Sequence, residues 1–226
     1  MEHNQQLSEN IVHANEIDVI DIYTTIQGEG PFAGQPCVFL RLAGCNLQCP
    51  KCDTDYTSNR HLKNPEQIIN NINKIHTTTN LVVITGGEPF RQHLEPLIVL
   101  LYEQSYDIQI ETNGTIYPGP NFPFQLVTIV CSPKTTLNNK IIPHIHCYKY
   151  ILKAGDVAKN GLPLHALTYS VPVPHPPQDH KQNIFLQPLD EEDEVSNLNN
   201  LKATVDSCLE HGYTLSLQLQ KYIGLS

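Results

Sequence analysis

Short apolar runs alternate with amphipathic segments along most of the chain, starting at Ile17. Eight of these runs predict strands, and several are apolar without a break, as in the sequences VVI and QLVTIV. The predicted strands cover residues 19–23, 37–42, 81–85, 107–111, 126–130, 147–152, 184–187 and 215–219. Unbroken apolar strands are typical of a sheet that is buried on both faces.

Three segments between these strands predict helices. The first starts at Asn64, an N-cap residue that is followed by proline at the first helical position and glutamine at the third. Its apolar face consists of Ile68, Ile69, Ile72 and Ile75. The second begins near Leu94, with Leu97, Ile98 and Leu101 as apolar residues. The third follows Asp190 and has an acidic first turn, which suits the helix dipole. Its predicted inward residues are Val195, Leu198, Leu201, Val205 and Cys208.

The alternation of strands and helices predicts βαβ units and a mainly parallel sheet. A complete eightfold barrel needs about 250 residues, so we predict an α/β fold with a partial (open) TIM-like barrel over residues 17–226. Residues 1–16 are polar and unpatterned, and we predict an N-terminal extension there. Residues 162–182 contain five prolines and three histidines without periodicity, which predicts a surface loop.

Charge and composition narrow the functional classes. The formal net charge of −9 argues against general binding of nucleic-acid backbones, which favours a basic face. No apolar run reaches the roughly 18 residues that a membrane span requires. The first residues lack the basic and apolar regions of a secretory signal, so we expect a cytoplasmic protein.

Three of the seven cysteines, Cys45, Cys49 and Cys52, form a CxxxCxxC set just after a predicted strand. Three thiolates on one loop can converge on one metal centre, whereas structural zinc sites and iron–sulfur cubanes usually take four protein ligands. The spacing therefore favours a cluster with one open coordination position. Two alternatives stay open: a zinc site completed by a distant histidine, and buried cysteines without a metal. The other cysteines, Cys37, Cys131, Cys147 and Cys208, fit packing positions.

The CxxxCxxC set resembles that of the radical S-adenosylmethionine (SAM) superfamily. In that superfamily the open iron of a [4Fe-4S] cluster chelates SAM, and reduction then splits SAM to a 5′-deoxyadenosyl radical. Thr85-Gly86-Gly87-Glu88-Pro89 follows at the end of a strand and resembles the motif that contacts the SAM amino group. Glu111-Thr112-Asn113-Gly114 ends the next strand, where the resemblance implies a carboxylate contact with a ribose hydroxyl.

Further motifs resemble one family, 7-carboxy-7-deazaguanine synthase of the queuosine and 7-deazapurine pathway. They are Gln27-Gly28-Glu29-Gly30, Arg41 with residues 44–47, Cys52-Asp53-Thr54, Ser132-Pro133-Lys134, residues 185–190 and residues 221–226. The resemblance implies a carbon–nitrogen lyase that converts 6-carboxy-5,6,7,8-tetrahydropterin to 7-carboxy-7-deazaguanine with loss of ammonia. It also implies a magnesium ion, a homodimer, and a reductant such as flavodoxin or ferredoxin.

The resemblance also implies roles for individual residues. Cluster ligands would be Cys45, Cys49 and Cys52, and the magnesium ligand would be Thr54. SAM would contact Lys51, Cys52, Asp53, Gly87, Glu111, Ser132, Pro133, Lys134, Gln187, Pro188, Leu189 and Asp190. Substrate would contact Ile26, Gln27, Gly28, Glu29, Arg41, Thr85, Gln220 and Ser226. The side-chain chemistry agrees, since Arg41 can pair with a carboxylate, and Gln27 and Glu29 can bond a heterocycle edge.

Two positions depart from the pattern of the family. Lys51 replaces a residue that is usually aromatic, and Gln220 replaces a histidine. These departures favour one alternative, a non-catalytic protein that keeps a cluster or zinc ion as an interaction module. Another alternative is a small radical SAM enzyme of the glycyl-radical activase kind, which acts on a protein. The QGEG, CDT and LQPxD motifs favour the synthase over both alternatives.

Overall fold

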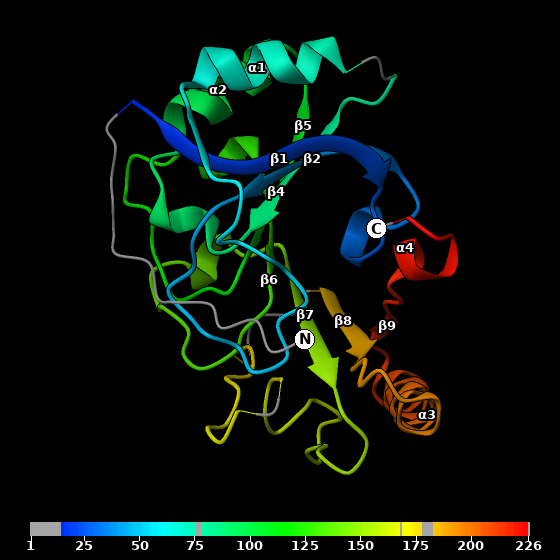
Figure 1. The fold of residues 1–226 in the computed structure, drawn as a ribbon. Helices are drawn as coiled ribbons and strands as arrows, with labels where there is room; N and C mark the ends of the chain where they lie inside the picture. Colours follow the sequence, from blue (N-terminus) through cyan, green and yellow to red (C-terminus); the bar gives the residue numbers. More distant parts are fainter. Residues whose placement is uncertain (1–14, 76–77, 168, 178–182, 226) are drawn as a thin grey trace.

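The computed structural model describes residues 15–75, 78–167, 169–177 and 183–225 (Figure 1). Its strands form one sheet in the order β3-β1-β2-β4-β5-β6-β7-β8-β9. They are β1 (Ile17–Ile26), β2 (Pro36–Leu42), β3 (His61–Lys63), β4 (Leu81–Gly86), β5 (Asp107–Thr112), β6 (Thr128–Cys131), β7 (Cys147–Leu152), β8 (Asn183–Pro188) and β9 (Thr214–Leu215). β1 is antiparallel to β2 and β3, and from β2 to β9 all neighbours are parallel.

The sheet is open, because its order starts at β3 and ends at β9. Helices α1 (Pro65–Lys74) and α2 (Glu95–Glu103) lie together over one part of it, and α3 (Glu194–His211) lies near β8 and β9 (Figure 1). A short helix, α4 (Leu219–Tyr222), follows β9. Single 3₁₀ turns cover Gly30–Phe32, Pro89–Arg91, Phe124–Leu126 and Ile142–His144. The predicted α/β partial barrel with a mainly parallel sheet is confirmed.

The start of α1 forms as its sequence predicts. The Gln67 backbone N–H donates to Asn64 Oδ1 at 2.8 Å, and the Asn64 N–H donates to Gln67 Oε1 at 2.9 Å, which completes a capping box. Ile68 and Ile72 are buried against the sheet, as are Leu97, Ile98 and Leu101 of α2. These side chains anchor both helices on the apolar core.

The predicted inward face of α3 is wrong at its first two positions. Val195 and Leu198 are 69% and 65% exposed. The buried residues of this helix are Asn200, Thr204, Ser207 and Cys208. Asn200 determines which side of α3 faces the sheet. Its side chain accepts from the Ala154 N–H at 2.8 Å and donates to the Leu189 carbonyl at 2.9 Å. Hydrogen bonds to the ends of β7 and β8 thus outweigh the burial of two apolar side chains.

Other differences concern the ends of strands. β3 was not predicted, since its three residues are half-buried or exposed. β6 starts at Thr128 because residues 124–126 form a 3₁₀ turn. β9 ends at Leu215, four residues before the predicted end, and Leu219 starts α4 instead. The chain leaves the sheet here, and the side chain of Gln218 turns toward the carboxylates of Glu29 and Asp53.

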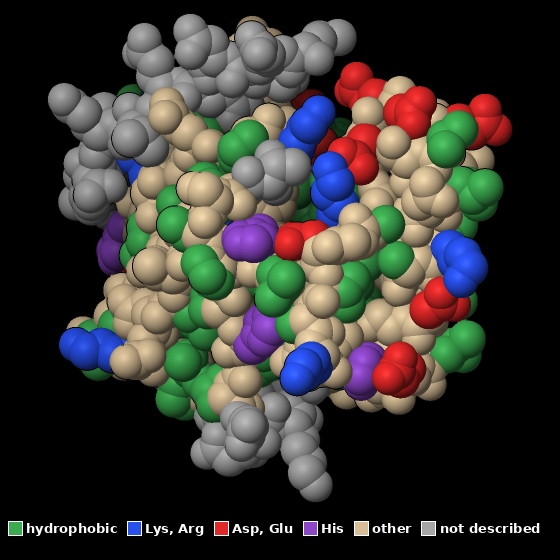
Figure 2. All heavy atoms as spheres, turned by 90° about the horizontal axis from the view of Figure 1, so that it is seen from below, with side chains coloured by type: hydrophobic (Ala, Val, Ile, Leu, Met, Phe, Trp, Pro, Cys, Tyr) green, Lys and Arg blue, Asp and Glu red, His purple; other side chains and the backbone are tan. Residues whose placement is uncertain are grey.

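The proline-rich segment is more than a surface loop. Leu162, Ala166 and Val173 belong to the core, and Leu167 is also buried. His165 Nδ1 lies 2.8 Å from Asp156 Oδ1, and His175 Nε2 lies 2.8 Å from the Pro163 carbonyl. On the face shown in Figure 2 the histidines form separate patches rather than one cluster. His180 and the predicted extension up to residue 14 lie outside the described residues.

None of the helices in the described ranges is long and apolar enough to cross a membrane.

The capping box of α1 gives a test of local stability. Asn64→Ala removes the acceptor for the Gln67 N–H, and we expect a loss of about 1 kcal/mol in the free energy of unfolding. A urea titration of the protein measures this loss. Asn70→Ala, on the exposed side of the same helix, is the matched control. Equal stability of the two variants would contradict the capping role.

Candidate active site

One large cavity of about 880 Å³ lies at the carboxyl ends of the parallel strands. Ligands in open α/β sheets gather at this edge. The cavity wall contains nearly every predicted site residue: Ile26, Gln27, Gly28, Glu29, Arg41, Cys45, Cys49, Lys51, Cys52, Asp53, Thr54, Thr85, Gly87, Glu111, Ser132, Lys134, Gln187, Leu189, Asp190 and Gln220. Pro133 and Pro188 are not in the wall. Ser226 lies outside the described residues.

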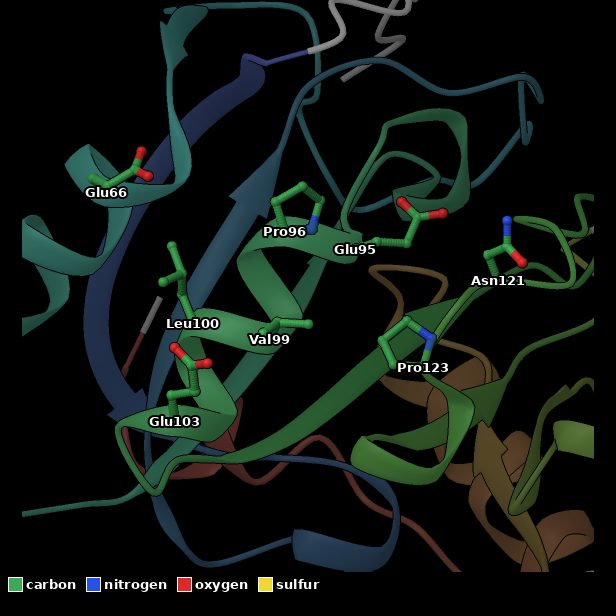
Figure 3. A pocket seen from close by; sticks show the side chains of 8 residues that line it. All are labelled: Glu66, Glu95, Pro96, Val99, Leu100, Glu103, Asn121 and Pro123. Atoms are coloured by element: carbon green, nitrogen blue, oxygen red, sulfur yellow. The ribbon is translucent and has the colours of Figure 1, made fainter.

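A second hollow of about 500 Å³ lies between α1, α2 and residues 121–123 (Figure 3). Its charged groups are the carboxylates of Glu66, Glu95 and Glu103, which are spread around it. No residue of the predicted site lines this hollow. The large cavity is therefore the candidate active site.

The cysteine loop, residues 43–56, connects β2 to the segment before β3. Its ends are joined by a hydrogen bond from the Gly44 N–H to the Tyr56 carbonyl at 2.8 Å. Inside the loop the buried Tyr56 hydroxyl donates to the Leu47 carbonyl at 2.9 Å. Asn46 links the loop to the end of β5, because it accepts from Asn113 Nδ2 at 3.0 Å. The loop is thus fixed at both ends and in the middle.

All three cysteines of this loop carry free thiols that line the cavity. Burial raises the pKa of Cys45 to about 12 and that of Cys52 to about 11. Metal ligation requires thiolates, so binding of a metal centre by these cysteines would release protons. No three His, Cys, Asp or Glu side chains in the described part of the chain are grouped to hold a single metal ion.

The Gly86-Gly87-Glu88 turn after β4 lies directly against the cysteine loop. A Cβ atom on Gly87 would lie 1.8 Å from the Gly44 carbonyl oxygen, so a side chain has no room there. Backbone bonds join the two loops, with the Glu88 N–H donating to the Gly44 carbonyl at 2.9 Å. The Glu88 side chain is completely buried and points away from the cavity. It accepts from Thr112 Oγ1 at 2.7 Å and from the Asn113 N–H at 2.8 Å.

Glu111 accepts hydrogen bonds from several residues in the part of the cavity predicted to bind substrate. Its carboxylate accepts from Gln27 Nε2 at 2.9 Å, from Gln109 Nε2 at 2.8 Å and from Thr85 Oγ1 at 3.1 Å. Gln27 is almost completely buried, and its Oε1 accepts from the Glu29 N–H at 3.3 Å. The orientation of the Gln27 amide is therefore fixed at both ends. Glu111 holds two predicted substrate residues, Gln27 and Thr85, in place.

Arg41 extends from β2 next to Thr85, its register partner on β4. One guanidinium nitrogen, Nη2, donates to the Tyr23 hydroxyl at 2.9 Å. The buried Nε atom has no hydrogen-bond partner among the described residues, and neither do the Oε1 atoms of Gln187 and Gln220. A buried polar atom without a partner is costly. These three atoms of the cavity wall are therefore expected to bond a ligand.

Glu29 forms an ion pair with Lys149, a buried residue of β7. Burial alone would lower the pKa of Lys149, but the carboxylates of Glu29, Glu111 and Asp53, together with the hydrogen bond to Glu29, more than offset this and raise it. The other Glu29 oxygen accepts from Gln218 Nε2 at 2.9 Å. Both carboxylate oxygens are thus occupied by chain donors.

On the predicted SAM side, Lys134 Nζ donates to the Ser132 carbonyl and hydroxyl at 2.8 and 2.6 Å. Burial lowers the pKa of this lysine. Asp190 forms an ion pair with Lys221 of α4 and accepts from Asn197 Nδ2 at 2.8 Å. The hydrogen bond from Lys221 is the main cause that lowers the pKa of Asp190, to about 2.

The sequence analysis assigned no role to three residues of this site, Lys149, Gln218 and Lys221. Lys149 had a usable signal, because it is a lone lysine in the apolar strand sequence CYKYIL. Lysine is almost never buried without a partner, so such a position implies a carboxylate nearby. Lys221 lies in the motif of residues 221–226, but the motif did not indicate its partner Asp190. Gln218 had no signal, since its partners are distant in the sequence.

Fold and site together define the class of the protein. The CxxxCxxC loop lies at the carboxyl end of a strand and packs against a Gly-Gly-Glu-Pro turn in an open, mainly parallel sheet. This arrangement is characteristic of a radical SAM iron–sulfur enzyme. A family model described as a 4Fe-4S single cluster domain matches residues 26–122.

Relatives place the chain within this class. The 7-carboxy-7-deazaguanine synthase of Rickettsia prowazekii is 38% identical, with 99% of this chain and 94% of the relative covered. That of Rhodospirillum rubrum is 36% identical, with 91% of each covered. The chain belongs to the 7-carboxy-7-deazaguanine synthase family. The crystal structure of QueE from Escherichia coli shares the fold, with a TM-score of 0.68, 22% identity, and 91% of this chain and 95% of that chain covered.

The contact between Gly87 and Gly44 predicts a defect in cluster binding. Gly87→Ala places a methyl group where the Gly44 carbonyl lies, so the cysteine loop has to shift. We expect reduced iron and sulfide content after anaerobic reconstitution, with weaker visible absorbance. Gly119→Ala is the control. Gly119 has a positive φ, unlike Gly87, so alanine there strains the backbone, but nothing lies within 4 Å of the added carbon. Normal cluster content in Gly87→Ala would contradict the prediction.

Proposed function

We propose that the chain converts 6-carboxy-5,6,7,8-tetrahydropterin to 7-carboxy-7-deazaguanine with loss of ammonia. The observation that carries this proposal is that one cavity is lined by three free cysteines and by three residues that each have a buried polar atom without a partner. The unpaired atoms are Arg41 Nε, Gln187 Oε1 and Gln220 Oε1. A flat heterocycle that carries a carboxylate and N–H groups suits Arg41 and Gln220, and SAM suits Gln187.

The cysteines would hold the cluster. Cys45, Cys49 and Cys52 would ligate three irons of a [4Fe-4S] cluster and leave the fourth for SAM. When bound, the cluster and SAM supply the electron and the 5′-deoxyadenosyl radical that removes hydrogen from the substrate. The glycine turn after β4 brings Gly87 backbone to the same wall of the cavity, where it would face the SAM amino group.

The substrate would lie beside β2, β4 and β5. Arg41 would pair with the substrate carboxylate through its unused Nε. Gln27 would present its remaining amide hydrogen, because Glu111 and the Glu29 N–H fix the rest of the side chain. Gln220 Oε1 would accept a substrate N–H. Gly28 lies so close to this oxygen that a Cβ would come within 1.5 Å of it, so glycine at 28 leaves room for Gln220.

Thr54 would bind the magnesium ion. Its hydroxyl donates to Asp53 Oδ1 at 3.2 Å, and hydroxyl oxygen is a ligand type that suits a hard cation. Magnesium keeps waters and substrate oxygens in its shell, so one protein ligand is enough.

We also propose a homodimer, and a flavodoxin or ferredoxin as the reductant. The seven free cysteines support a cytoplasmic location, because reducing compartments preserve thiols.

The decisive test is an anaerobic assay of reconstituted protein with SAM, magnesium, dithionite and the pterin, followed by mass spectrometry. We expect 7-carboxy-7-deazaguanine from the native chain. Cys49→Ala is expected to lose SAM cleavage because one cluster ligand is missing. Cys208→Ala, a buried cysteine on α3, is expected to keep it. SAM cleavage without any change in the pterin would overturn the proposed substrate.

The magnesium ligand has its own test. Thr54→Ala is expected to raise the magnesium concentration for half-maximal activity by about tenfold or more. Cluster absorbance and SAM binding are expected to stay unchanged. Thr57→Ala removes a hydroxyl from the same part of the chain that bonds Asp55 instead, and serves as the control. An unchanged magnesium response in Thr54→Ala would exclude this residue as the ligand.

A further inference from the structure

The side chain of Gln218 joins two carboxylates from distant parts of the chain. Gln218 immediately precedes α4 and is buried. Its Nε2 donates to Glu29 Oε1 at 2.9 Å and to Asp53 Oδ2 at 3.2 Å. An amide group carries two hydrogens on this nitrogen, one for each carboxylate. The residue thus connects the loop after β1 with the cysteine loop.

These two bonds are part of a longer line of contacts. Glu29 is also paired with Lys149, and the other oxygen of Asp53 accepts from the Thr54 hydroxyl. The line runs from β7 through Glu29, Gln218 and Asp53 to Thr54. Lys149 supplies one positive charge against two carboxylates. A neutral double donor between the carboxylates adds no charge and satisfies one oxygen of each.

The neighbouring backbone holds Gln218 in this place. The Ser216 N–H donates to the Leu186 carbonyl at 2.8 Å, and the Gly30 N–H donates to Ser216 Oγ at 3.1 Å. The Leu219 N–H donates to the Gly28 carbonyl at 3.2 Å. The segment of residues 216–219 is therefore bonded to the loop after β1 on both sides of Gln218.

We propose that Gln218 is a positioning residue that fixes the loop after β1 relative to the cysteine loop. It acts through Glu29 and Asp53 rather than by touching substrate. Gln218 fixes the position of Glu29 in the part of the cavity wall predicted to contact substrate. Through Asp53 it also fixes the direction of the Thr54 hydroxyl. These effects on binding rest on the proposed function, whereas the link between the loops does not. The cysteine loop keeps its separate bonds to β4 and β5, so cluster binding does not depend on Gln218.

The test compares Gln218→Glu with Gln125→Glu, which makes the same charge change at an exposed turn. Gln218→Glu keeps the shape of the side chain but replaces the double donor by a third carboxylate. We expect faster amide hydrogen exchange in residues 27–30 and 216–225, measured on cluster-loaded protein without substrate. In the assay we expect KM for the pterin and the half-maximal magnesium concentration to rise about tenfold.

A second variant separates hydrogen bonding from general damage. Gln218→Glu combined with Asp53→Asn restores an amide–carboxylate pair with donor and acceptor exchanged, and Asp53→Asn alone is its control. We expect a KM below that of Gln218→Glu and slower exchange in residues 216–225. A double variant no better than Gln218→Glu would overturn the proposal.

The remaining outcomes separate the two proposals. If amide hydrogen exchange in residues 27–30 and 216–225 of Gln218→Glu equals that of Gln125→Glu, the positioning role is overturned, whatever the activity of the variant. Faster exchange with unchanged KM and magnesium response would also overturn it, because the link would then be only structural. Faster exchange in a protein whose native form makes no 7-carboxy-7-deazaguanine would keep the link between the loops and reject the proposed function.

Discussion

The backbone of the glycine turn after β4 meets the backbone of the cysteine loop with no space between them for a side chain. Parallel pairing of β2 and β4 brings the two loops out at the same edge of the sheet. Gly87 then allows the close approach, and the hydrogen bond from Glu88 to Gly44 fixes it. The position of Cys45 relative to the rest of the cavity follows from this contact. The place of the cysteine loop thus depends on a glycine as well as on its own residues.

Donors of the chain bond the carboxylates of the cavity wall, whereas Arg41, Gln187 and Gln220 each keep a polar atom without a partner. Glu29 is paired with Lys149, Asp190 with Lys221, and Glu111 accepts three hydrogen bonds. The Glu29–Lys149 pair is nearly buried, and removing one partner of such a pair costs much more than forming it gains. The pair of Asp190 and Lys221 is partly exposed, so it contributes less. Arg41 retains a free donor, so a carboxylate ligand meets attraction instead of repulsion at this wall.

Local patterns predicted much of the molecule. The capping box at Asn64 and the apolar faces of α1 and α2 depend on neighbouring residues, and the structure has them as predicted. The strands of the parallel sheet lie near their predicted positions, except that β6 starts later and β9 is shorter. The motifs also predicted which residues line the cavity, because parallel strands end at a common edge. The face of α3 was mispredicted because Asn200 bonds to strand ends far away in sequence. Gln218 was missed for the same reason.

The contacts of Gln218 span 189 residues to Glu29 and 165 residues to Asp53. Closing such long loops has a high entropic cost, and distant pairings form slowly. During folding, the sheet and the cysteine loop can therefore assemble while this side of the cavity is still open to solvent. The part of the cavity wall that Gln218, Gln220, Lys221 and Leu225 supply is therefore the last to form, after the walls that the strand ends and the cysteine loop provide.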